Sequence, residues 1–196
     1  IEALKQKGYT FYRGRGVFRM DFWRALKKFF KLKTREARKA EFLYHEGNYL
    51  RKLGYIDRAL ECYERAIELV PEHVESWINR GVLLRKKGFL EEAIECYDNA
   101  IRLEGGDTEA WNDKGVALGL LRQPEQALQC YDMAIKKDPQ YAPAWSNKGS
   151  TLWDLGKMDE AMKCLEKAIE FNPRYAPAWY NRGYILHQMG KLNEAL

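Results

Sequence analysis

The sequence predicts an all-α protein, an α-α superhelix (solenoid) in which antiparallel helix pairs repeat every 34 residues. The first observation is the even spacing of the four cysteines, Cys62, Cys96, Cys130 and Cys164, which follow one another at intervals of 34 residues. The second is that the segments around them are near copies, as in ECYERAI and ECYDNAI. The third is that each repeat holds two stretches with apolar residues at helical spacing. A period of this length predicts stacked units that share one continuous core.

The first half of each repeat predicts a helix, because a tryptophan, a glycine and a leucine follow one another at spacings of four and three residues. In the second unit these residues are Trp77, Gly81 and Leu84. Glycine inside a helix costs about 1 kcal/mol relative to alanine, so we expect it to mark a close approach of the two helices. Gly88 stands where a left-handed residue ends the helix, and Arg122 takes that place in the third unit.

The second half of each repeat predicts the other helix, with Ala93, Tyr97 and Ala100 on one face in the second unit. Prolines close three of the repeats and break this helix. Because the chain starts with isoleucine and stops inside the pattern, we expect it to be a fragment of a longer protein. The predicted units run 40–73, 74–107, 108–141, 142–175 and, as a partial unit, 176–196.

These motifs carry a family resemblance. The pattern W-x3-G-x2-L, then A-x3-Y-x2-A, then proline, on a 34-residue period, resembles the tetratricopeptide repeat (TPR). The resemblance covers residues 40–196 and implies a superhelix that acts as a protein–protein interaction scaffold, with the first helix of each unit lining its concave side. The sequence departs from the family pattern just before each glycine, where we expect a more polar flank: Glu46, Arg80, Lys114, Lys148 and Arg182.

The cysteine spacing argues against disulfides and zinc. Equivalent helices of stacked units lie about 9–10 Å apart, whereas a disulfide needs Cα atoms within about 7 Å. Zinc sites use ligands that converge through short C-x2-4-C steps, and the sequence has none. We therefore expect the cysteines to be small buried apolar residues of a cytoplasmic protein that needs no metal or other cofactor.

No motif of catalysis is present. The three histidines, His45, His73 and His187, do not stand beside a nucleophile in a known motif, and the sequence lacks a phosphate loop, an H-E-x-x-H, a G-x-S-x-G and a dinucleotide fingerprint. The sequence therefore predicts a protein that is not an enzyme. The alternative hypothesis is a substrate-recognition arm of a larger enzyme whose catalytic domain lies outside this chain.

The face of each first helix opposite the tryptophan predicts a groove for a protein or extended peptide. Asn79, Asn147 and Asn181 recur two residues after the tryptophan, and an amide can both donate and accept. The array is similar to the asparagine ladder of O-GlcNAc transferase repeats, which implies binding of a peptide backbone, although His45 and Asp113 interrupt it. Apolar residues on this face predict contacts with partner side chains. The predicted groove residues are His45, Asn48, Asn79, Val82, Asp113, Val116, Asn147, Tyr180, Asn181 and Tyr184.

The N-terminal segment, residues 1–39, is strongly basic, with 13 Lys and Arg against 3 acids. Phe22, Ala25, Phe29 and Leu32 fall in register with the second helix of a unit, so we interpret the segment as a degenerate capping repeat. The alternatives are a basic aromatic helix that contacts nucleic acid or an anionic membrane, and a site for an acidic protein. Association of copies through the open ends of the array is a further hypothesis.

Overall fold

The computed structural model describes residues 35–104 and 107–190, and within these ranges the chain forms nine helices and no strand. The first helix of each unit is α3, α5, α7, α9 or α11, and the second is α4, α6, α8 or α10. The helices are α3 (Arg35–Lys52), α4 (Ile56–Leu69), α5 (Val74–Lys87), α6 (Leu90–Glu104), α7 (Thr108–Leu120), α8 (Pro124–Lys137), α9 (Ala142–Asp154), α10 (Met158–Phe171) and α11 (Ala176–Gln188).

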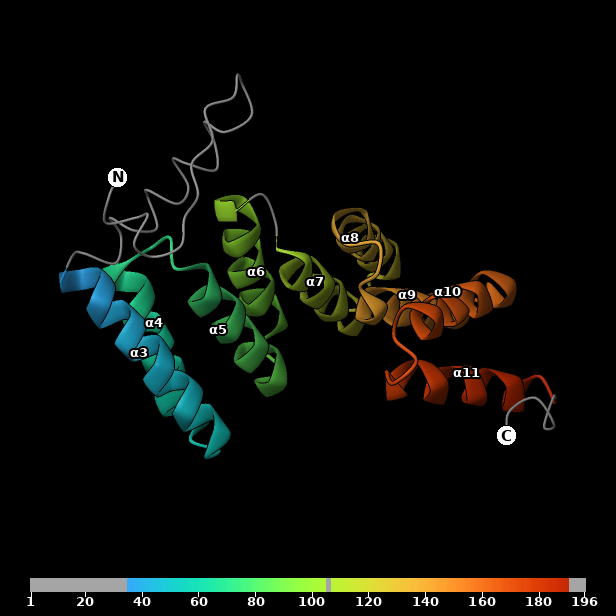
Figure 1. The fold of residues 1–196 in the computed structure, drawn as a ribbon, viewed down its shortest axis with the longest axis horizontal. Helices are drawn as coiled ribbons and strands as arrows, with labels where there is room; N and C mark the ends of the chain where they lie inside the picture. The colour runs from blue at the N-terminus through green and yellow to red at the C-terminus, as the bar shows by residue number, and fades with distance from the viewer. Residues whose placement is uncertain (1–34, 105–106, 191–196) are drawn as a thin grey trace, which may run out of the picture.

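The helices pair within units and the units stack along one axis. Helix α3 packs on α4, α5 on α6, α7 on α8 and α9 on α10, and first helices of neighbouring units also touch, as α7 does with both α5 and α9. In Figure 1 the units follow one another from the α3–α4 pair at one end of the molecule to α11 at the other. This arrangement confirms the predicted all-α superhelix of helix pairs.

Helix α3 begins at Arg35, so its first five residues lie in the segment that we assigned to residues 1–39. Ala37 and Ala40 are buried on this part of the helix. The rest of the basic segment, residues 1–34, lies outside the described residues, as do residues 191–196 of the partial unit. None of the helices that the structure describes has the length and apolar character needed to cross a bilayer.

The helix ends follow the predicted left-handed pattern. Gly88, for example, ends α5 with a φ of +89°. In the third unit Arg122 takes the same conformation with a φ of +61°, although a side chain disfavours it. Pro124 then starts α8, where its missing N–H costs nothing.

In three units a glycine inside the first helix leaves room for a tyrosine ring of the second helix, and in the fourth unit Gly149 does so for the Leu165 side chain. A Cβ placed on Gly81 would lie 2.7 Å from Cε1 of Tyr97, and one on Gly115 would lie 2.5 Å from Cε1 of Tyr131. Real Cβ atoms do not come this close to a ring carbon, so only glycine fits. The finding confirms the predicted close approach and identifies the tyrosine ring as its cause.

All four cysteines are buried and free, each one residue before the residue that packs on the glycine. Burial raises the pKa of the Cys96 and Cys130 thiols to about 11. The thiolate, which is the reactive form, is therefore scarce at neutral pH. The structure confirms the prediction that these residues serve as small members of the core.

Two kinds of polar contact accompany the junctions between units. In three units the basic residue before the glycine pairs with an acid on the preceding second helix: Arg80 with Glu64, Lys114 with Asp98 and Lys148 with Asp132. In three units the tryptophan indole donates to the carbonyl of the proline in the linker before it, and Trp77 Nε1 lies 2.9 Å from the oxygen of Pro71. The predicted polar flank therefore belongs to the stacking of one unit on the next.

The end of the array at α3 exposes aromatic residues at positions that are buried elsewhere. Phe42 is 66% exposed and Tyr49 is 62% exposed. The residues 34 and 68 positions after Phe42 are Ser76 and Ala110, and both are fully buried. Leu83, which stands 34 residues after Tyr49, is fully buried as well. In the inner units a preceding unit covers this surface, so α3 shows what an N-terminal cap would cover.

We expect Gly81→Ala to lower the free energy of unfolding by about 1–3 kcal/mol, because the new methyl group overlaps the Tyr97 ring. Gly119→Ala is the matched control, since Gly119 also lies inside a first helix but its nearest neighbour, the Tyr131 hydroxyl, is 4.0 Å from the Cβ position. It should raise stability by about 0.5–1 kcal/mol. Urea unfolding of both variants tests this, and equal effects would contradict the packing account.

We expect deletion of residues 1–34 to destabilise the array if the segment caps it. The loss should be about 1.5–3 kcal/mol for each large apolar side chain that becomes uncovered. The variant Phe42→Ser/Tyr49→Ser of the 196-residue chain should lose a similar amount of stability. Deletion of residues 1–34 from this variant should then cause little further loss. Thermal unfolding measures these effects. Unchanged stability, with loss of salt-sensitive binding to nucleic acid or anionic vesicles, would instead favour the polyanion hypothesis.

Candidate functional site

The ten predicted groove residues all lie on first helices, spread along the array from α3 to α11. One hydrogen bond joins two of these ten residues, from Asn79 to Asn48. His45 and Tyr180 lie on helices at opposite ends of the molecule (Figure 1). The candidate site is therefore a line of side chains along the stack and not a compact cluster.

The asparagines of the ladder contact the first helix of the preceding unit. Asn79 Nδ2 donates to Asn48 Oδ1 at 3.0 Å, and Asn147 Nδ2 donates to Asn112 Oδ1 at 2.9 Å. Asn181 Nδ2 lies 3.4 Å from Ser146 Oγ in the same arrangement. These amides, which the sequence predicts to face a bound peptide, therefore also join neighbouring units.

Two acceptors of this network were missed from the sequence. Asn112 and Ser146 are buried, and each directly follows the tryptophan of its unit. The second unit has Ile78 at this position, so a polar residue here is not a feature of every repeat. A polar residue at an otherwise buried position was the available signal.

The ladder asparagines keep hydrogen-bonding capacity. Within the described part of the chain, the Oδ1 atoms of Asn79, Asn147 and Asn181 accept no hydrogen bond. All three side chains are half-buried. Each amide can therefore still accept one N–H group of a bound segment and donate its second N–H.

Asp113 interrupts the ladder with a carboxylate. It is half-buried, and its Oδ1 accepts from Asn112 Nδ2 at 3.3 Å. Burial raises its pKa, while the Arg85 guanidinium and the Asn112 amide act in the opposite direction. Glu109 lies one turn earlier on α7, and its pKa is raised by burial, by Asp113 and by Asp107. Neither acid forms an ion pair with a described residue, but the Arg85 and Arg51 guanidinium groups are near enough to lower the pKa of Asp113 and of Glu109 respectively.

Two second helices bring a tyrosine near this row of predicted groove residues. Tyr63 donates to Asn48 Oδ1 at 2.9 Å. In the next unit Val82 stands where Asn48 stood, and the fully buried Tyr97 has the Arg85 guanidinium beside its hydroxyl. Burial raises the pKa of Tyr97 and the charge of Asp113 adds to the shift, while Arg85 lowers it by a side-chain hydrogen bond and by its charge.

The opposite end of the row is aromatic. Tyr180 is 74% exposed and Tyr184 is also exposed on α11. The Trp153 ring meets Tyr184 edge to face, with 6.5 Å between ring centroids. This end offers large apolar surface without acidic groove residues.

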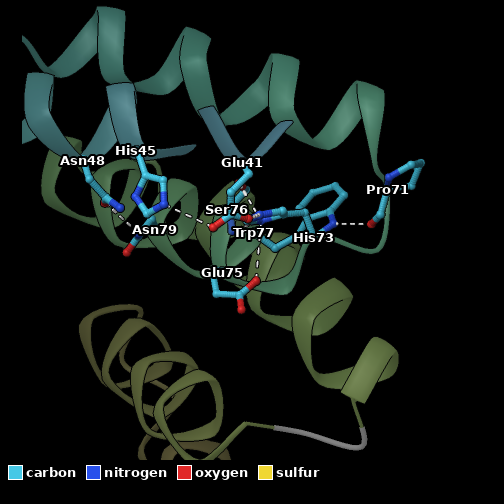
Figure 2. Close-up of polar contacts among 9 residues, drawn as sticks. All are labelled: Glu41, His45, Asn48, Pro71, His73, Glu75, Ser76, Trp77 and Asn79. Atoms are coloured by element: carbon cyan, nitrogen blue, oxygen red, sulfur yellow. Dashed lines mark hydrogen bonds and ion pairs between the residues drawn. The ribbon is translucent and has the colours of Figure 1, made fainter. Parts of the chain in front are cut away.

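His45 belongs to a polar cluster at the junction of the first two units (Figure 2). Glu41 lies 3.1 Å from His45 Nε2 and 3.3 Å from His73 Nε2. His73 Nδ1 accepts from the backbone N–H of Ser76 at 3.2 Å and so caps α5. With Nδ1 as acceptor, the neutral ring carries its proton on Nε2 and donates it to Glu41. The cluster is thus a structural link, and in the part of the chain described here no group of His, Cys, Asp and Glu is arranged to hold a metal ion.

Protein-family models match most of the repeat region. Models described as "Tetratricopeptide repeat" match residues 44–107 and 108–141, and one described as "TPR repeat" matches residues 149–190. The chain is a tetratricopeptide repeat protein. Repeats of this family generally mediate protein–protein interaction, and their fold is typically a non-catalytic scaffold.

Solved TPR structures are similar along most of the chain. A thermophilic TPR protein of Thermus thermophilus has a TM-score of 0.70 and 24% identity, covering 80% of this chain and 86% of that one. The MamA protein has a TM-score of 0.67 and 24% identity, with coverages of 80% and 86%. YrrB, described as a TPR protein with an unusual peptide-binding site, has a TM-score of 0.60 and 25% identity, covering 79% of each chain.

One curated relative matches a short part of the chain. The mouse (Mus musculus) protein O-mannosyl-transferase TMTC1 is 34% identical over 58 residues, which are 29% of this chain and 6% of the relative. The chain therefore corresponds to a small fraction of the length of that protein.

We expect Asp113→Asn to raise the melting temperature at pH 7. Because the pKa of Asp113 is raised on folding, its ionised form costs stability above the ordinary aspartate pKa of about 4. Asparagine keeps an acceptor for Asn112 and removes the charge. The gain should shrink as the pH falls, because the raised pKa lets native Asp113 take up a proton before the same residue does in the unfolded chain.

Asp132→Asn is the matched control for this measurement, because Asp132 is exposed and paired with Lys148. Its melting temperature at pH 7 should be equal to that of the native chain or slightly lower. Equal responses of the two variants in a pH series of thermal scans would contradict the burial cost assigned to Asp113.

Proposed function

We propose that this TPR array is a non-catalytic scaffold that binds an extended peptide segment of a partner protein in the concave groove. The observation that carries the proposal is the row of half-buried asparagines on three first helices, α5, α9 and α11, each with an amide oxygen that accepts no hydrogen bond from a described residue. Such amides can bind a peptide backbone whatever its side chains are.

The spacing of the units suits an extended chain. Neighbouring packed helices lie about 8–10 Å apart, and an extended peptide advances about 3.3 Å per residue. Asparagines on successive units therefore meet roughly every third residue of the segment. Intervening side chains would contact Val82, Val116, Tyr180 and Tyr184, while His45 and Asn48 line the far end of the same groove. The peptide-binding site named in the description of YrrB supports this class of ligand.

The second candidate function is a recognition arm of a larger enzyme. The match to part of the O-mannosyl-transferase TMTC1 favours it, because there a similar segment is a small part of a long protein. The same groove would then select the substrate of a catalytic domain elsewhere. Contact of residues 1–34 with nucleic acid or an anionic membrane, and association through the array ends, are separate hypotheses outside the described residues.

We expect Asn147→Ala/Asn181→Ala to weaken a groove-bound peptide by about 1–3 kcal/mol, because two backbone contacts are lost in a partly desolvated site. The peptides are selected from a random library on the immobilised 196-residue chain, and fluorescence anisotropy measures their affinity. The variant should also lose about 0.5–1.5 kcal/mol of stability per asparagine, since each amide bonds to the preceding unit.

Asn99→Ala is the matched control, because Asn99 lies on a second helix and bonds to the Glu95 carbonyl of its own helix. Affinity is compared at a temperature at which circular dichroism shows all variants folded. Selected peptides that bind the double variant and Asn99→Ala equally well would move the binding site away from the asparagine row.

A further inference from the structure

We propose that the junction between the second and third units is a hinge, at which the array divides into two bodies, α3–α6 and α7–α11. The inference does not depend on the proposed peptide binding, because it follows from the contacts between units. At the other three junctions that the structure describes, two kinds of directional hydrogen bond hold the first helix of the following unit. Both kinds are missing where α7 follows α5 and α6.

The first missing contact is the hydrogen bond between neighbouring first helices. At the other junctions an amide donates to a polar residue of the preceding first helix: Asn79 to Asn48, Asn147 to Asn112 and Asn181 to Ser146. These acceptors stand one or five residues after the tryptophan position, where α5 has the apolar residues Ile78 and Val82. Asp113 replaces the donor amide and accepts from its own helix instead. Arg85 attracts Asp113 by its charge, but the two form no ion pair.

The second missing contact is the hydrogen bond of the tryptophan indole. The Nε1 atoms of Trp77, Trp145 and Trp179 each lie 2.9 Å from the carbonyl oxygen of the proline in the linker before their helix. The linker before α7 has no proline, and the buried Nε1 atom of Trp111 has no hydrogen-bond partner among the described residues. The bond that holds the start of α5, α9 and α11 to the preceding linker is therefore absent at α7.

The contacts that remain at this junction hold the units together but restrain their angle weakly. Ile78 packs with Ala100 and Ala110 in a buried apolar cluster, and apolar packing is non-directional. The ion pair of Lys114 with Asp98 is also present, but an exposed pair of this kind is a weak restraint. Helices α6 and α7 therefore stay packed while the angle between them can change.

The hinge lies inside the row of predicted groove residues. Asn79 belongs to the body before it, whereas Asn147 and Asn181 belong to the body after it. Rotation at the junction changes the angle between these two parts of the row. Within each part, the bonds between units keep the spacing of the side chains. The interruption of the ladder at Asp113 thus coincides with the place where the array bends.

Spin labels at equivalent positions measure the hinge in the 196-residue chain. One exposed residue recurs every 34 positions on α4, α6, α8 and α10: Glu61, Glu95, Gln129 and Lys163. The native cysteines are buried, so labels are attached in pairs through keto amino acids introduced at these positions. Double electron–electron resonance gives the distance distribution of each pair. The pair on α6 and α8, the hinge pair, should have a distribution about twice as wide as those of the pairs on α4 and α6 and on α8 and α10, because labels on two sides of a hinge sample several angles. Equal widths for the three pairs would overturn the proposal.

Exchange of contacts between junctions tests their role. Ile78→Asn/Asp113→Asn gives the hinge the residue pair that Asn112 and Asn147 form between the third and fourth units, so the distribution of the hinge pair should narrow toward the others. The reciprocal variant Asn112→Ile/Asn147→Asp should widen the distribution of the pair on α8 and α10. If neither width changes in folded variants, as checked by circular dichroism, the missing contacts are not the cause and the proposal fails. Should a variant not fold, the comparison of the three pairs in the native chain still decides.

Discussion

The contact between a helix glycine and the aromatic ring packed on it determines the geometry on which the rest of the structure depends. In the second unit the distance between Gly81 and the Tyr97 ring leaves no room for a Cβ atom. A side chain there would separate the two helices and shift every contact with the next unit. In the first unit the packed tyrosine also bonds to a predicted groove residue, since the Tyr63 hydroxyl donates to Asn48. There one aromatic residue both packs in the core and contacts the proposed binding face.

The stacking of units is directed by polar contacts that are individually weak. An exposed ion pair such as Lys114–Asp98 contributes about 0–1 kcal/mol, and a hydrogen bond such as Asn147–Asn112 contributes about 1 kcal/mol. Burial of apolar residues supplies most of the stability, but it specifies register poorly because it is non-directional. The polar contacts fix how one unit sits on the next. The spacing of the ladder amides, on which the proposed peptide binding depends, is therefore held partly by those amides themselves.

The fold was predictable because its determinants lie within single units. The 34-residue period predicts both helices of each unit. It also predicts a left-handed residue at Arg122, which stands where other units have glycine, and the φ of Arg122 is +61°. The cross-unit bonds were not predictable, because they depend on the rotation between neighbouring helix pairs. Asn79 therefore appeared free, and the Arg85 guanidinium beside the Tyr97 hydroxyl was not anticipated. The start of α3 at Arg35 was missed because no tryptophan or proline signal precedes it.

Asp113 is the position at which this chain departs from the pattern of its own ladder. An asparagine there would keep an acceptor for Asn112 and avoid the cost of a half-buried charge, and asparagine does stand at the ladder position of three other units. The Arg85 guanidinium offsets part of this cost, because its charge opposes the rise in the pKa of Asp113. The same guanidinium acts on the buried Tyr97 hydroxyl by charge and by a side-chain hydrogen bond. One arginine thus serves two polar groups that belong to neighbouring units, so the departure at Asp113 comes with a local change in how these units are joined.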